Sequence, residues 1–244
     1  MGASMFALLA SCVPQRQWRT HPSAEGAPAG MDVEQRFVIP ADPDKNRNYS
    51  LAFVEFKNNG EFWDKRQLEE ALLSIDEADR RSNHHALVIA FLHGWKNNAQ
   101  KSNANVLDFR RQLNRIAAKA CRGNETRCGV AGVYLAWSGD IVGRDWNTLR
   151  TLSYFNRRNT AASVASAPIG DALFAIMKRV KSGPGRGTNH SVVVGHSFGG
   201  LILENAIAKR MKELGDELHE ELGKRHTSEG FRLSALDDFA ILWS

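Results

Sequence analysis

The residues best suited to chemistry lie in a short stretch around position 197. Residues 192–202 read VVVGHSFGGLI, so an apolar β-branched run leads through Gly195, His196, Ser197, Phe198 and Gly199 into a helix-compatible sequence. This pattern predicts a strand, a sharp turn and a helix, with Ser197 in a strained conformation at the apex. Gly195 and Gly199 flank the serine because side chains there would clash with the neighbouring strand and helix. The context favours a nucleophilic serine over a structural turn.

The same turn would place Ser197 at the N-terminus of the following helix. Backbone N–H groups and the helix dipole favour negative charge at that position. An oxyanion formed beside the serine would therefore meet the Phe198 N–H. A serine nucleophile also needs a general base to take its proton and a carboxylate to orient that base.

The histidines do not supply an evident base. Of the eight in the chain, only His93 and His196 fall at the predicted edge of the sheet that carries Ser197. His196 adjoins the serine, so we expect its side chain to be directed elsewhere and its role to be structural. We expect His93 to shape the loop after its strand rather than to act as the base.

Strands and helices alternate along the part of the chain that must position this site. Apolar and alternating runs predict strands at 50–56, 86–92, 130–137, 192–195 and 239–243, and amphipathic segments predict helices at 64–80, 103–120, 167–181 and 198–222. Residues 58–60 read NNG and predict a hairpin turn. Buried strands that alternate with helices indicate an α/β domain with a mainly parallel sheet and flanking helices. Residues 138–165 form a long irregular connection, which we interpret as a lid or loop.

The N-terminus predicts export and a lipid anchor. Residues 1–12 contain a short apolar run that suits a signal peptide and end in LASC, which resembles a bacterial lipobox with Cys12 as the lipidated residue. No Lys or Arg precedes Cys12, which departs from that pattern; the alternative is an apolar tail with an incidental cysteine. Residues 13–48 are rich in Pro, Gly, Ala and charge, so we expect a flexible tether before a domain at 49–244.

The two remaining cysteines also favour an exported protein. Cys121 and Cys128 bracket a short polar loop and can close into a disulfide, which persists in the periplasm rather than in the cytosol. The alternative is a pair of free thiols. No His or further Cys stands at a spacing suited to a zinc site. We therefore expect a bacterial cell-envelope protein that faces the periplasm, with a cytoplasmic location as the alternative.

The charge distribution of the chain does not indicate a nucleic-acid partner. The chain of 244 residues has 32 Lys and Arg against 27 Asp and Glu, a net charge of +5. The basic residues are scattered, without an aromatic platform or a groove-reading motif, so we interpret them as solvated helix faces.

The elbow GHSFGG, the loop FLHGW after an earlier strand, and their order in the chain resemble the α/β-hydrolase superfamily. Together with the lipobox-like start and the segments FVEF, FLHGWKNNA and YLAW, they look like bacterial α/β-hydrolase lipoproteins of undefined substrate. The resemblance covers residues 49–244. It implies that Ser197 is the nucleophile of an ester or thioester hydrolase and that a small-molecule acyl ester is the substrate. It implies an oxyanion hole made by the N–H of Phe198 and an N–H of the loop His93-Gly94-Trp95, with Trp95 the first choice and Gly94 the second. It implies no metal and no cofactor.

In that superfamily the acid and the histidine follow the elbow on later strands. Only one strand is predicted after the helix that follows Ser197. We therefore expect residues 49–244 to be the N-terminal portion of the fold, incomplete at the C-terminus, with the base and the acid beyond residue 244. Residues 1–244 alone should then show little or no esterase activity. The alternative is a non-catalytic envelope binding module that retains the hydrolase fold.

Overall fold

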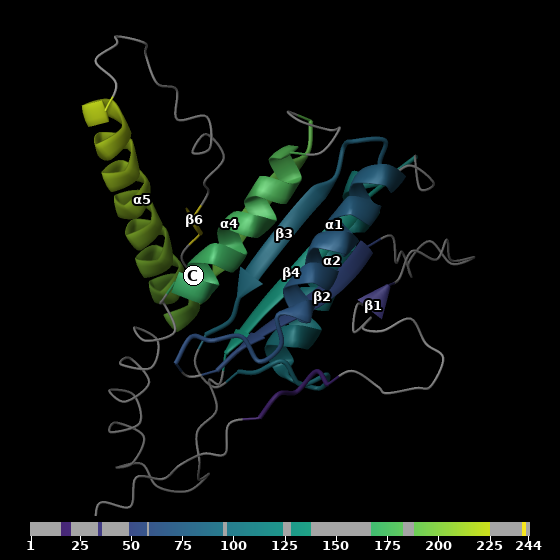
Figure 1. Ribbon diagram of the computed structural model, residues 1–244. Coiled ribbons are helices and arrows are strands. Elements are labelled where there is room, and N and C mark those ends of the chain that lie inside the picture. Colours follow the sequence, from purple (N-terminus) through teal and green to yellow (C-terminus); the bar gives the residue numbers. More distant parts are fainter. Residues whose placement is uncertain are drawn as a thin grey trace, which may run out of the picture.

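The computed structural model describes residues 16–20, 34–35, 49–57, 59–94, 97–123, 128–137, 167–182, 188–224 and 241–242. The strands are β1 (Glu34–Gln35), β2 (Tyr49–Phe56), β3 (Leu87–Leu92), β4 (Val130–Trp137), β5 (His190–Gly195) and β6 (Ile241–Leu242). The helices are α1 (Arg66–Arg81), α2 (Ala104–Ala120), α4 (Ala167–Ser182) and α5 (Phe198–Lys224). Strands that alternate with helices confirm the predicted α/β class (Figure 1).

The strands form one sheet in the order β1-β2-β4-β3-β5-β6. The strands from β2 to β6 pair in parallel, and β1 pairs antiparallel with β2. The register aligns the strand ends: Leu92 pairs with both Leu135 and Gly195, and Phe56 pairs with Trp137. The ends of β2, β4, β3 and β5 therefore meet at one edge, here called the C-terminal edge of the sheet.

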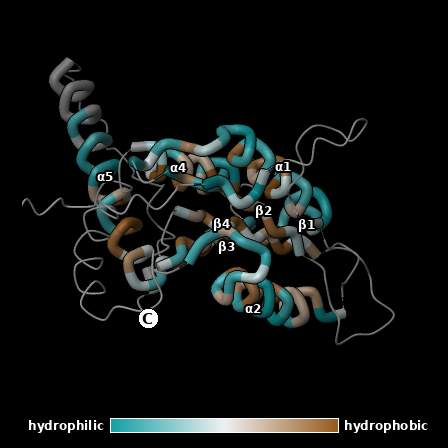
Figure 2. Tube along the Cα trace, turned by 90° about the horizontal axis from the view of Figure 1, so that it is seen from below, coloured by the Kyte–Doolittle hydropathy of each residue, from teal (hydrophilic) through white to brown (hydrophobic). Residues whose placement is uncertain are grey.

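Helices cover both faces of the sheet, as Figure 2 shows with α1 and α4 on one side and α2 on the other. One buried cluster joins α1, α4 and α5 to one face through residues such as Ile75, Ile176 and Ile202. The other cluster joins α2 to the opposite face through Phe109 and Leu113. Because both faces are covered, β2 and β4 are buried along their whole length.

The helices begin and end close to the predicted positions for identifiable reasons. The Asn103 side chain accepts the Asn105 N–H and caps α2, and the Asp64 carboxylate accepts the Arg66 N–H at the start of α1. Helix α5 continues through Gly215 and ends at Lys224. No described helix is long and apolar enough to cross a membrane.

Two short segments correct the prediction of a flexible tether at 13–48. Residues 34–35 form β1 on the outer side of β2, and residues 16–20 contact the sheet, with only 2% of Arg19 exposed. The physical reason is the buried carboxylate of Glu55 in β2, which accepts the backbone N–H groups of Trp18 and Arg19, both at 2.8 Å. The tether prediction is therefore wrong for these residues. Residues 1–15, with Cys12, and residues 138–165 lie outside the described part of the chain.

The predicted hairpin after β2 is reduced to a tight turn. Gly60 has a φ of +84°, which suits glycine, and the Lys57 N–H donates to the Glu61 carbonyl at 2.7 Å. The return segment makes one antiparallel bridge, between Phe56 and Phe62, before α1 begins.

Candidate active site

Ser197 lies at the apex of the turn between β5 and α5. Its φ is +55°, a left-handed conformation that is uncommon for a residue other than glycine, and its side chain is exposed. The His196 N–H donates to the Leu92 carbonyl at 3.0 Å, which extends the pairing of β3 with β5 by one residue. The next bonds already close the first turn of the helix, because Gly200 N–H donates to the Ser197 carbonyl at 2.9 Å. The chain therefore reverses within two residues and leaves the serine hydroxyl outside the sheet.

Two glycines make this sharp reversal possible through close approach of the backbone. A Cβ on Gly195 would lie 2.6 Å from the Gly200 Cα, and a Cβ on Gly199 would lie 2.2 Å from the Leu92 carbonyl oxygen. Both contacts are with backbone atoms, which cannot move aside as a flexible side chain can. The start of α5 is therefore packed directly on the ends of β5 and β3, as the residue pattern predicts.

The loop after β3 lies against the turn. A Cβ on Gly94 would lie 2.6 Å from the His196 carbonyl oxygen and 2.9 Å from the Ser197 Cβ. This contact brings together the two segments that the sequence singles out, GHSFGG and HGW. Trp95, the first choice for the second oxyanion donor, lies outside the described residues, so the structure places Gly94 but not the Trp95 N–H.

His93 is fully buried and has a partner on each ring nitrogen. Its Nε2 accepts the Trp137 N–H at 3.0 Å, and its Nδ1 lies 2.8 Å from the Gly94 carbonyl, to which it donates in this tautomer. The His93 carbonyl in turn accepts the Trp137 indole N–H at 3.0 Å. Burial lowers the pKa of His93 to about 4. The side chain is thus a neutral brace between the loop and β4, and neither nitrogen remains for the Ser197 proton.

His196 is half-buried next to the same loop. Its Nδ1 is buried and makes no hydrogen bond within the described part of the chain, and it would lie 3.0 Å from a Cβ on Gly94. The ring therefore fills space between the turn and the loop. Phe198, the first residue of α5, is 8% exposed and packs in the buried cluster that joins α4 and α5 to the sheet.

The other described histidines lie far from Ser197. His190 begins β5, and His84 and His85 precede β3, so all three are at the opposite edge of the sheet. The His84 Nδ1 lies 2.8 Å from the Asp79 carboxylate there. His219 stands 22 residues along α5 from Ser197, about 33 Å at the ordinary helical rise. Within the described ranges, no histidine is placed to act as the general base.

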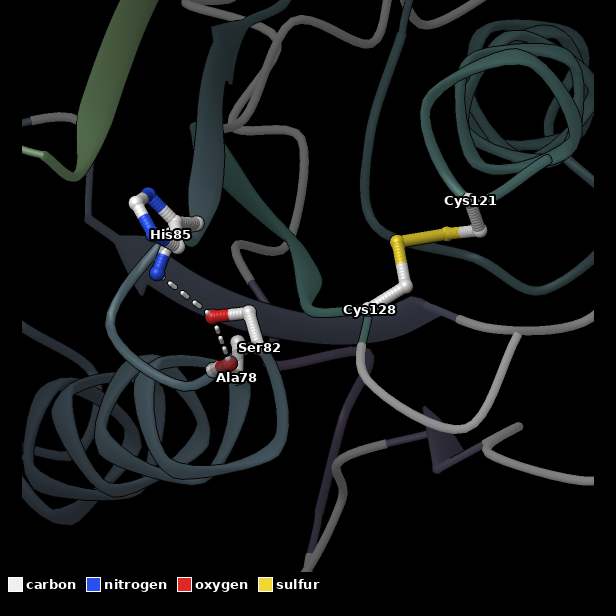
Figure 3. Close-up of a disulfide and its surroundings, with 5 residues drawn as sticks. All are labelled: Ala78, Ser82, His85, Cys121 and Cys128. Atoms are coloured by element: carbon white, nitrogen blue, oxygen red, sulfur yellow. Dashed lines mark hydrogen bonds between the residues drawn. A yellow bond between two sulfur atoms is a disulfide. The ribbon is translucent and has the colours of Figure 1, made fainter. Parts of the chain in front are cut away.

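That opposite edge also carries the disulfide. Cys121, at the end of α2, and Cys128, before β4, are joined with their Cα atoms 5.2 Å apart, which is the pair the sequence suggested (Figure 3). Beside it, the Ser82 hydroxyl donates to the Ala78 carbonyl and accepts the His85 N–H at the end of α1. The described residues contain no group of three His, Cys, Asp or Glu side chains that could hold a metal ion.

The residue pattern did not reveal the contact network around Glu55. Besides the two backbone N–H groups, the carboxylate accepts the Gln67 amide at 3.1 Å, and the Arg19 guanidinium donates to the Ala99 carbonyl at 2.6 Å. Burial raises the pKa of Glu55, although the N–H donors act against it. The signal was a carboxylate within an otherwise apolar strand, YSLAFVEF, because a buried charge requires partners.

A scan against protein-family models, a search of curated proteins and a search of solved structures returned no match. The functional reading therefore depends on the geometry around Ser197.

Proposed function

We propose that this chain is part of a serine hydrolase of the α/β-hydrolase type, which cleaves a carboxylic ester or thioester through an acyl-enzyme on Ser197. One observation carries the proposal: Ser197 is exposed and has a left-handed backbone conformation, between a parallel strand and a helix. Gly195 and Gly199 hold it there, and any side chain at these two positions would clash with neighbouring backbone. Strain of this kind persists where the surrounding structure enforces it and is concentrated at functional sites.

The geometry suits acyl transfer to water. The Ser197 Oγ would attack the carbonyl carbon, and the developing oxyanion would lie near the N-terminus of α5 and the loop of Gly94. The donors we propose are the N–H of Phe198 together with the N–H of Trp95, or of Gly94 as the second choice. The leaving alcohol or thiol departs with a proton, and water then hydrolyses the acyl-enzyme.

A hydrolase of this kind needs a base that the described residues do not supply near Ser197. His93 holds its loop in place and has a pKa of about 4, so at neutral pH it remains uncharged with both nitrogens engaged. We therefore place the base and its orienting carboxylate outside the described part of the chain, in its other segments or in sequence beyond residue 244. Export, a lipid on Cys12 and a periplasmic location remain part of the proposal.

The absence of a base near Ser197 among the described residues also supports a second candidate, a non-catalytic envelope binding module that keeps the same fold. The two candidates differ in whether Ser197 is reactive. A fluorophosphonate probe forms a stable bond with an activated serine, and we expect it to label the full-length protein and to leave Ser197→Ala unlabelled. Ser191→Ala, a substitution in β5 before the turn, serves as the matched control and should label like the parent. Equal labelling of the parent and of Ser197→Ala would exclude the hydrolase and favour the binding module.

A further inference from the structure

A surface of two tryptophans and two basic residues lies at the C-terminal edge of the sheet. The Arg16 guanidinium lies 3.4 Å from the centroid of the Trp18 ring, and the Lys57 ammonium lies 5.9 Å from that of Trp63. Arg16 is exposed, and the other three are half-buried. Arg16, Trp18 and Trp63 line the same small hollow, next to Trp137 at the end of β4. Arg16, Trp18, Lys57 and Trp63 are called the Trp-basic surface below.

Glu55 fixes both halves of this surface. Its carboxylate accepts the Trp18 and Arg19 N–H groups, and its backbone carbonyl accepts the Trp63 N–H at 2.9 Å. Arg19 continues inward, with its guanidinium 3.7 Å from the centroid of the Phe53 ring. The segment 16–20, purple in Figure 1, is thereby held against the ends of β2 and β4.

This combination of side chains suits the surface of an anionic bilayer. Tryptophan prefers the boundary between water and hydrocarbon, where one end of its ring is apolar and its N–H remains hydrated. Lys and Arg gain favourable energy near a negatively charged leaflet. Glu61 accepts from Lys57 at 3.0 Å and is exposed, so lipid phosphates would compete with a carboxylate that water already screens.

The Trp-basic surface and Ser197 lie at the same edge of the sheet. Gly195 is level with Leu135, so β5 ends two residues before the level of Trp137 and Phe56, and Ser197 follows in the turn at this same edge. Three strand spacings separate β2 from β5, about 14 Å. Cys12 stands four residues before Arg16, which limits its distance from Arg16 to about 14 Å of extended chain. A lipid on Cys12 would therefore bring this edge close to the membrane.

We propose that the Trp-basic surface rests on an anionic lipid bilayer and turns the C-terminal edge of the sheet toward it. A consequence, which depends on the proposed function, is that Ser197 takes an acyl group carried by a membrane lipid. The docking itself requires neither an active serine nor a lipid on Cys12. It can therefore be tested with Cys12→Ser, which cannot be lipidated.

The test is flotation of the full chain carrying Cys12→Ser with vesicles. We expect binding to phosphatidylcholine vesicles that contain one quarter phosphatidylglycerol, much weaker binding to phosphatidylcholine alone, and weakening of the former by salt. Adding Arg16→Gln and Lys57→Gln should lower the partition coefficient about 30-fold, which corresponds to about 1 kcal/mol for each basic residue. The matched control, Arg115→Gln with Lys119→Gln, removes two exposed charges from α2 and should change it less than threefold.

Two results would overturn the proposal: no preference for anionic vesicles, or equal losses in the surface variant and in the α2 control. Thermal unfolding of each variant verifies that it is folded. Fluorophosphonate labelling of the full-length parent in solution reports on the proposed function separately, so labelling without vesicle binding rejects only the docking. Vesicle binding without labelling rejects only the hydrolase.

Discussion

Replacing Gly199 by alanine tests whether the contact between α5 and the end of β3 creates the turn at Ser197. The added Cβ would lie 2.2 Å from the Leu92 carbonyl oxygen and 2.6 Å from that of His93. An ordinary contact lies between 3.4 and 4 Å, so helix and strand must separate by roughly an ångström. Both opposing atoms are backbone atoms, which places the cost near the upper end for overpacking, about 3 kcal/mol.

Part of this cost is offset because alanine favours helix over glycine by about 1 kcal/mol. The net loss in the free energy of unfolding should be about 2 kcal/mol. In urea this lowers the midpoint by roughly 0.7 M if the slope is about 3 kcal/mol per molar. Gly215→Ala is the matched control on the same helix, because a Cβ there meets nothing within 4 Å. The free energy of unfolding of that variant should rise by up to about 1 kcal/mol.

The assay is urea unfolding followed by circular dichroism, combined with the rate of fluorophosphonate labelling. Gly199→Ala should lose labelling even under conditions where it is folded, because the serine is displaced from the loop of Gly94. The reasoning is refuted if Gly199→Ala unfolds at the parent's midpoint, or if it loses no more stability than Gly215→Ala.

Three further predictions concern other contacts of the structure. The pKa of His93 is lowered to about 4 in the folded state, so its contribution to stability is complete above the unfolded value of about 6.5 and is lost as the pH falls. The free energy of unfolding should decrease by about 2 kcal/mol between pH 7.5 and 5.0 from this group, and urea titrations of His93→Gln should show a flatter dependence. Reduction of the disulfide between Cys121 and Cys128 should lower the free energy of unfolding by about 2.5 kcal/mol, as expected for a loop of this length. A Cys121→Ser, Cys128→Ser variant should unfold at the same urea concentration with and without reductant. Glu55→Gln removes a charged acceptor from two backbone N–H groups and should lower the free energy of unfolding by about 2 kcal/mol. Trypsin should then cleave faster after Arg19, whereas the exposed control Glu61→Gln should be cleaved at the parent's rate.

The sheet and its helices were predictable because their signals are local and repeated. The run VYLAW lies in β4 and VVVG ends β5, each strand buried or partly buried as its apolar residues require. The turn at Ser197 was predictable because small residues at fixed positions report a close approach of backbones. Helix α5 runs through Gly215, as the predicted range 198–222 requires, because a single exposed glycine costs a long helix only about 1 kcal/mol.

Long-range contacts were not predictable from the residue pattern. Residues 16–20 have no periodicity, and what orders them is a carboxylate 36 residues away, together with the Ala99 carbonyl 80 residues away. Local composition gives no information on such partners, so the segment read as a tether. The role of His93 was foreseen in part: its position after a strand predicted a loop-shaping residue, but its bond to the Trp137 N–H depends on the pairing of β3 with β4.

The most direct test of the central claim is to locate the covalent adduct of a fluorophosphonate or an activated ester by mass spectrometry of the intact protein and of its peptides. In the full-length protein we predict a single addition per chain, on the peptide that contains Ser197, and its loss in Ser197→Ala. An adduct distributed over several serines, or one that persists in Ser197→Ala, would contradict the assignment of Ser197 as the nucleophile.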